Sequence, residues 1–164
     1  MSGKKDIIAA IIINFRMLYI ASDHAGFQLK KEIIKYLKTQ LNKEVEDLGP
    51  TGFVDTDDFP DFAIPLAKEV VKNDDNFGIL ICGTGQGMCI AANKIKGGRA
   101  IIGYNLQATE LGRKHNNSNI ICLAARLVPS TDFANAIVKK FLETKFDGDA
   151  RFVRRNKKIE DLEK

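Results

Sequence analysis

FGILICGTGQG, residues 77–87, places a buried apolar strand directly before a turn with three glycines. The run 77–82 is apolar on both faces, which is typical of a central strand in a parallel sheet. Glycines in the turn let an anion approach the backbone amides closely, and a helix N-terminus adds further N–H donors. We therefore predict a strand, a turn and a helix over 87–95, with ligands bound beyond the carboxyl end of the strand.

Outward from this stretch, the chain repeats the alternation of strand and helix. Further strands are predicted at 17–22, 43–49, 99–104 and 119–124. Further helices are predicted at 26–41, 62–72, 107–115 and 131–144, with another after Gly148. This order predicts an α/β protein with a three-layer Rossmann-like fold, in which helices cover both faces of a five-stranded parallel sheet.

Composition indicates one globular domain. The length of 164 residues fits a single domain, and a net charge of +4 does not by itself indicate a nucleic-acid or membrane partner. Three cysteines without metal-ligand or disulfide spacing favour a reduced, cytoplasmic protein with no metal. We expect residues 1–16 to be an N-terminal extension, either disordered or upstream of the true start, and residues 17–164 to form the domain.

Two predicted strands end in side chains that can carry chemistry. Cys82 ends the central strand and faces the amide-rich turn, which would favour its thiolate as a nucleophile or general base. The alternative is a small buried hydrophobic residue, which we assign to Cys89 and Cys122. Asp23 and His24 follow the first strand, with a helix cap and a partly buried histidine as the structural alternatives.

Other motifs leave alternatives open. The glycines run G-x-G-x-G, which matches neither the dinucleotide nor the P-loop pattern, so the turn is either an anion hole or a tight connection. His115 ends a helix, and we expect it near the same sheet edge as His24. In DFPDFA, Asp58 and Asp61 are expected to cap the helix that follows. The basic tail at 151–158 fits a solvated helix, a phosphate site or a nucleic-acid patch.

Five ordered motifs resemble the type B family of ribose-5-phosphate isomerases, a group that includes galactose-6-phosphate and allose-6-phosphate isomerases. The motifs are SDHAGFQLK, DFPDFA, ICGTGQGMCIAANK, RKHNNSNIICLAARLV and the basic tail, and they extend from Met17 to about Ile159. The resemblance implies that 17–164 is a sugar-phosphate isomerase domain. It would interconvert ribose 5-phosphate and ribulose 5-phosphate through a cis-enediolate, without a metal or organic cofactor.

The resemblance also implies roles for single residues. Cys82 would be the general base, because relatives that lack this cysteine carry a glutamate where this chain has Met88. His115 would open the furanose ring, and Thr84 would stabilise the enediolate together with the amides of the turn. The residues that would bind the sugar or its phosphate are Asp23, His24, Gly83, Gly85, Gln86, Gly87, Asn116, Arg126, Arg151 and Arg155.

Family members form homodimers or dimers of dimers, which implies a site between chains. His115, Asn116 and Arg126 would face the Cys82 of a neighbour. Near the tail, relatives read E-G-G-R-H where this chain reads DGDARF (147–152), so that Phe152 replaces a histidine and Arg154 is an alternative to Arg155. Two other functions stay open: a hexose 6-phosphate isomerase, and a non-catalytic phosphosugar- or nucleic-acid-binding module. A thiol beside an acid and histidines favours an enzyme.

Overall fold

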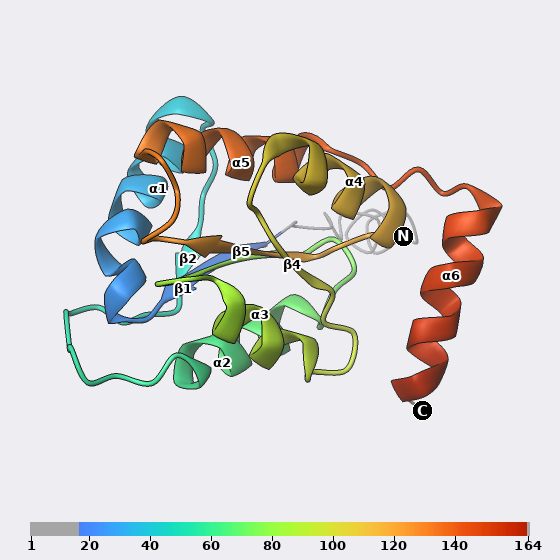
Figure 1. Cartoon of the computed structure of the whole chain (residues 1–164), viewed down its shortest axis with the longest axis horizontal. Helices are drawn as coiled ribbons and strands as arrows, with labels where there is room; N and C mark the ends of the chain where they lie inside the picture. Colours follow the sequence, from blue (N-terminus) through green and yellow to red (C-terminus); the bar gives the residue numbers. More distant parts are fainter. Residues whose placement is uncertain (1–16, 164) are drawn as a thin grey trace, which may run out of the picture.

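The computed structural model describes residues 17–163, in which five parallel strands form one sheet in the order β2-β1-β3-β5-β4 (Figure 1). The expected extension over 1–16 lies outside the described residues. The strands are β1 (Leu18–Ser22), β2 (Glu46–Asp47), β3 (Phe77–Cys82), β4 (Ala100–Ile102) and β5 (Ile120–Ala124). The predicted α/β fold with a five-stranded parallel sheet is confirmed.

Helices cover both faces of the sheet and complete the three layers. They are α1 (Phe27–Gln40), α2 (Pro60–Val70), α3 (Gln86–Asn93), α4 (Leu106–Asn116), α5 (Thr131–Glu143) and α6 (Ala150–Glu160), with short 3-10 turns η1 (His24–Gly26) and η2 (Asp161–Glu163). Helices α1, α4 and α5 lie on one face, α2 and α3 lie on the other, and α6 stands at the edge of the molecule (Figure 1). Among the helices of residues 17–163, none combines the length and the hydrophobicity that a membrane-spanning helix needs.

The two apolar layers alternate along each central strand, because successive strand residues point to opposite faces. Ile79 and Ile81 of β3 join the core cluster that includes Ile33 of α1 and Phe141 of α5. Leu80 joins the cluster on the α2–α3 side. Burial on both faces explains why the central strands are almost uninterrupted apolar runs.

The edge strands are shorter than the sequence predicts. Instead of 43–49 and 99–104, β2 spans two residues and β4 spans three. An edge strand pairs on one side only, so its ladder stops as soon as the backbone turns away from its single neighbour. After β2 the chain turns at Gly49, whose φ is +103°, and continues through a cis peptide bond to Pro50.

Strand order places the topological switch point of the sheet between β1 and β3. The chain moves outward from β1 to β2 and then returns to β3 on the other side, which makes this pair the switch point where α/β proteins bind ligands. The Asp23 N–H donates to the Ile81 carbonyl at 3.1 Å, joining the two strand ends. A Cβ on Gly26 would lie 2.5 Å from the same oxygen, so only glycine allows η1 to press against β3.

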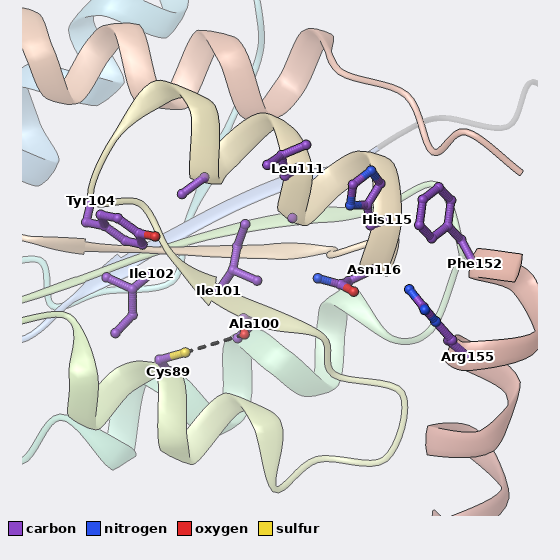
Figure 2. Close-up of a pocket in the computed structure, with 12 residues that line it drawn as sticks. Cys89, Ala100, Ile101, Ile102, Tyr104, Leu111, His115, Asn116, Phe152 and Arg155 are labelled. Carbon is purple, nitrogen blue, oxygen red and sulfur yellow. Dashed lines mark hydrogen bonds between the residues drawn. The ribbon is translucent and has the colours of Figure 1, made fainter. Parts of the chain in front are cut away.

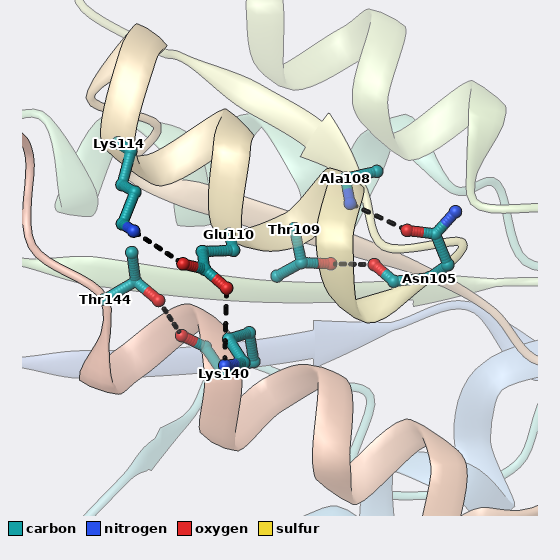
Figure 3. A network of polar contacts seen from close by, with 7 residues as sticks. All are labelled: Asn105, Ala108, Thr109, Glu110, Lys114, Lys140 and Thr144. Carbon is teal, nitrogen blue, oxygen red and sulfur yellow. Dashed lines mark hydrogen bonds and ion pairs between the residues drawn. The ribbon is translucent and has the colours of Figure 1, made fainter.

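Polar contacts fix helix α4 at both ends (Figure 3). Asn105 caps its start by accepting from the Ala108 N–H at 2.7 Å. Glu110 pairs with Lys114 of the same helix at 2.6 Å and with Lys140 of α5 at 3.5 Å. These contacts hold the C-terminal turn of α4, which carries His115, at a fixed place against α5.

Candidate active site

Cys82 ends β3 inside the glycine turn, where its side chain is almost fully buried. Gly85 takes a left-handed conformation with φ +74° and begins helix α3 as its N-cap. In this conformation the Gly85 N–H donates to the Cys82 sulfur at 3.1 Å. That amide therefore faces the Cys82 sulfur, instead of facing substrate oxygens as the resemblance implied.

Arg126 belongs to the Cys82 group of its own chain. The Ala125 N–H donates to the Cys82 carbonyl at 2.8 Å, and the Arg126 N–H donates to the Gly83 carbonyl at 3.0 Å. A Cβ on Gly83 would lie 3.3 Å from Cδ and Nε of Arg126, so the side chain runs along this glycine. The expectation that Arg126 groups with His115 and Asn116 is therefore wrong, because the backbone pairing after β5 directs it over β3.

Asp23 and His24 occupy the neighbouring strand end. The Asp23 carboxylate accepts from the Gly26 N–H at 3.1 Å, so it is a cap, as its structural alternative predicted. Burial raises the pKa of this carboxyl. The Nδ1 atom of His24 lies 2.7 Å from the Oδ1 atom of Asp57, and the hydrogen bond to Asp57 raises the pKa of the imidazole.

Asp57 was missed by the sequence reasoning, which considered only Asp58 and Asp61. Helix α2 has Phe59 at its N-cap and no side-chain cap hydrogen bond, so the capping expected of Asp58 is wrong. Asp61 lies in the first turn of the helix. Four aspartates between 55 and 61 give no local signal for the one that turns inward, since the contact with His24 spans 33 residues.

Thr84, Gln86 and Gly87 form the outer side of the turn. Thr84 and Gln86 are exposed and line a cavity of about 380 Å³ with mostly apolar neighbours. Gly87 lies under the ring of Phe59, and a Cβ there would be 2.8 Å from the ring. The turn is therefore open on the side of Thr84 and closed on the side of Gly87.

His115 and Asn116 line a second cavity of about 660 Å³, together with Phe152 and Arg155 (Figure 2). The rings of His115 and Phe152 are stacked, with 4.1 Å between centroids and 18° between planes. Asn156 donates to the carbonyl oxygens of both residues at 3.0 Å. Helix α6 is thereby tied to the end of α4.

The same cavity distinguishes Arg155 from Arg154, the alternative that the sequence left open. Both arginines are exposed, but Arg155 lines this cavity and Arg154 does not. The Arg151 guanidinium lies 4.6 Å from the ring centroid of Phe152. Arg151 and Arg155 are one helical turn apart, so both lie on the face of α6 that meets His115.

The two groups of predicted residues lie at opposite ends of the sheet. Ile120, the first residue of β5, pairs with Gly78 of β3. Gly78 precedes Cys82 in the same strand, so the start of β5 lies about 13 Å from Cys82, measured along the strands toward their N-terminal ends. His115 ends the helix that leads into β5, so it lies at this lower end. The expectation that His115 and His24 share one sheet edge is wrong, because a helix between parallel strands returns to the opposite edge.

Comparison with known proteins identifies the family. A family model described as Ribose/Galactose Isomerase matches residues 18–159. The chain belongs to the ribose/galactose isomerase family. The resemblance to type B ribose-5-phosphate isomerases is thereby confirmed.

Relatives within the ribose/galactose isomerase family match most of the chain. A probable ribose-5-phosphate isomerase B from Mycoplasma genitalium is 49% identical over 150 residues, which cover 90% of this chain and 95% of the relative. The Mycoplasma pneumoniae counterpart is 44% identical over 131 residues, covering 80% and 85%. The crystal structure of ribose-5-phosphate isomerase B from Mycoplasma genitalium with bound ribulose 5-phosphate gives a TM-score of 0.86 at 45% identity, covering 91% of this chain and 97% of that one.

The two other cysteines of this family member differ in setting. Cys122 is fully buried, and burial raises the pKa of its thiol well above the usual range. Cys89 packs against the core as expected, but it is only partly buried and also lines the His115 cavity. A hydrogen bond with Cys122 lowers the pKa of Cys89, while its sulfur donates to the Ala100 carbonyl at 3.4 Å. Cys89 is therefore the thiol against which the role of Cys82 has to be tested.

Metal ligands are not clustered in the described part of the chain. Among residues 17–163, no three or more histidine, cysteine, aspartate or glutamate side chains are arranged to hold a metal ion.

Proposed function

We propose that this protein is an aldose–ketose isomerase that interconverts ribose 5-phosphate and ribulose 5-phosphate. The observation that carries the proposal is the Cys82 thiol at the switch point of the sheet, held by the Gly85 amide and flanked by Asp23, His24 and Arg126. A thiol in an anion-binding turn suits proton transfer next to a phosphate-bearing sugar. The ribulose 5-phosphate bound by the Mycoplasma genitalium relative supports the substrate class.

Proton transfer would proceed through a cis-enediolate. The Cys82 thiolate removes the proton from C2 of the open-chain aldose, and the C–H electron pair forms a C1–C2 double bond while negative charge moves to O1. A proton passes from O2 to O1, C2 becomes the carbonyl carbon, and the thiol returns its proton to C1. The Thr84 hydroxyl and the outer amides of the turn would stabilise the charged oxygens, by about 3–4 kcal/mol for each well-aimed donor.

His115 would open the furanose ring before this step. It would take the proton of the anomeric hydroxyl and supply one to the ring oxygen, with Asn116 beside it to hold the sugar. Arg126, Arg151 and Arg155 would bind the phosphate, for which the planar guanidinium is well suited because it makes paired hydrogen bonds.

A second copy of the chain would complete the site. His115 cannot reach Cys82 of its own chain, because the two lie at opposite ends of the sheet. In a dimer with two-fold symmetry, the His115 end of one chain meets the Cys82 end of the other, and two equal sites result. We expect such a homodimer, alone or paired as a dimer of dimers, in the cytoplasm, without a cofactor.

The direct test is an assay of purified protein for formation of ribulose 5-phosphate from ribose 5-phosphate. Allose 6-phosphate and galactose 6-phosphate serve as parallel substrates. We expect turnover of ribose 5-phosphate with the highest kcat/KM. A higher kcat/KM for a hexose 6-phosphate would mean that the hexose phosphate, and not ribose 5-phosphate, is the substrate. A folded protein that turns over none of the three sugars would overturn the proposal.

A further inference from the structure

His24 is joined twice to one carboxylate from a distant loop. The Oδ1 atom of Asp57 accepts from the His24 backbone N–H at 2.9 Å and lies 2.7 Å from the ring Nδ1. The Asp57 side chain is 9% exposed and that of His24 is 29% exposed. The other oxygen of Asp57, Oδ2, is buried and has no hydrogen-bond partner within residues 17–163.

The loop that carries Asp57 is anchored to helix α1 at its start. The fully buried Lys30 donates to the Oδ1 atom of Asp47 and to the Pro50 carbonyl, both at 2.7 Å. Farther along the loop, the Phe53 ring meets His24 edge-on with 6.4 Å between centroids. These contacts fix the start and middle of the loop, so that Asp57 returns to His24 at a defined position.

We propose that Asp57 is a positioning residue, which holds His24 as an imidazolium with its Nε2–H free to bind the phosphate of the substrate. Nδ1 is committed to Asp57, so Nε2 is the remaining donor of the ring. The inference rests on the proposed function for the identity of the anion as a sugar phosphate.

Electrostatics at this site favour a charged imidazole. A buried carboxylate with one oxygen unpartnered requires a counter-charge, and the imidazolium supplies it. The hydrogen bond to Asp57 is the largest cause of the raised pKa of His24; Asp23 acts in the same direction, and Arg126 opposes it. Together, His24 and Arg126 place two positive groups beside the turn that follows Cys82.

The sign of the pH dependence follows from the raised pKa. Below it, His24 is positive and its contribution to phosphate affinity is complete. As pH rises through it, the charge of His24 and this contribution are lost together. Removing the Asp57 charge should move this loss to lower pH.

NMR titration of the full chain tests the proposal directly, because the sequence holds only two histidines. In Asp57→Asn, we expect the pKa of His24 to fall while that of His115 is unchanged. The matched control is Asp55→Asn, which removes the same charge from an exposed position in the same loop and should shift neither histidine. An unchanged His24 pKa in folded Asp57→Asn would overturn the proposal.

Binding of inorganic phosphate separates this inference from the enzyme proposal. We expect Asp57→Asn to weaken the binding of inorganic phosphate about tenfold and to raise the KM for ribose 5-phosphate by a similar factor. This is the change expected when one hydrogen bond to a charged group is lost. In a His24→Gln background the same substitution should have no further effect, because Asp57 acts through His24. Additive losses, or unchanged phosphate affinity, would overturn the inference even if the isomerase is active. If the wild type turns over no sugar phosphate, the enzyme proposal is overturned. The role of Asp57 is then decided by the phosphate titration alone.

Discussion

The sulfur of Cys82 accepts a hydrogen bond from the Gly85 N–H at 3.1 Å, so the strand end and the glycine turn form one unit. Replacing Cys82 by alanine removes the proposed base from this unit. We expect kcat to fall by about 10²–10⁴-fold, the usual contribution of general acid–base catalysis, with substrate affinity nearly unchanged. Steady-state kinetics and calorimetric binding of ribulose 5-phosphate measure the two quantities.

Cys89→Ala is the control for this substitution, since Cys89 is the thiol that lines the His115 cavity. It should keep most of the wild-type kcat, because the Cys89 sulfur is bound to the Ala100 carbonyl. A large loss in Cys89→Ala together with a small one in Cys82→Ala would transfer the role of base to Cys89.

Gly85→Ala tests whether the turn has to stay in its left-handed conformation. A Cβ at φ +74° would also lie 3.2 Å from the Leu123 backbone carbon, so we expect a loss of stability above the ~1–2 kcal/mol of the conformation itself, and a loss of activity. Gly148 is a matched control, because its φ is +67° and a Cβ there would meet nothing within 4 Å. Gly148→Ala should show the conformational cost in urea unfolding with kcat unchanged. Equal activity in both variants would mean that the Gly85 amide is not needed.

Mixing two inactive variants tests whether the site is shared between chains. Cys82→Ala and His115→Ala each remove one half, and a mixed dimer has one site with both wild-type residues. After unfolding and refolding an equal mixture, we expect about a quarter of the wild-type activity to return, if pairing is random. Mixtures no more active than the separate variants would show that Cys82 and His115 do not meet across an interface.

Phe152→Leu tests the stacking on His115. Leucine fills most of the space but has no flat ring, so the imidazole of His115 loses the stacked ring whose centroid lies 4.1 Å away. We expect the free energy of unfolding to change by less than about 1.5 kcal/mol. We expect roughly tenfold slower turnover of ribose 5-phosphate, whose ring must be opened, and a smaller effect on erythrose 4-phosphate, which cannot close a furanose ring. Phe152→Tyr should restore the rate. Equal losses on both sugars would exclude a role in ring opening.

Lys30→Met tests the anchor under the loop. The variant keeps the buried stem but leaves the Asp47 carboxylate and the Pro50 carbonyl without their 2.7 Å donor. We expect a loss of about 2 kcal/mol in the free energy of unfolding, less than for a fully buried pair because Asp47 is partly exposed. The exposed neighbour provides the control: Lys31→Met should change stability by less than about 0.5 kcal/mol.

The central part of the fold could be predicted because burial on both faces leaves a direct trace in the sequence. The strand at 77–82 matches its prediction, and β1 and β5 differ from theirs by one residue at the start. The edge strands left no such trace, and the predicted runs 43–49 and 99–104 were too long. Each edge strand ends where its pairing with its one neighbouring strand ends. The local sequence does not show where that pairing stops.

The candidate site was predictable where residues directly follow a strand. Cys82 and Asp23 were found by that rule, and their strand ends do meet. Asp57 was not found, since its partner is fixed by the path of a loop rather than by spacing. His115 was assigned to the wrong edge of the sheet. Helix α4 begins at the edge where β4 ends and runs back to the opposite edge, so its last residues, including His115, lie at that opposite edge.

Because Cys82 and His115 lie at opposite ends of one sheet, the specific activity of the protein should depend on its concentration. Under the proposed assembly, a dilute chain would keep its secondary structure and its core, yet it would hold two unmatched halves. Specific activity would fall with dilution while the circular dichroism spectrum stayed the same. A substitution far from both halves that weakens self-association would then resemble an active-site lesion in an assay at low protein concentration and look harmless at high concentration.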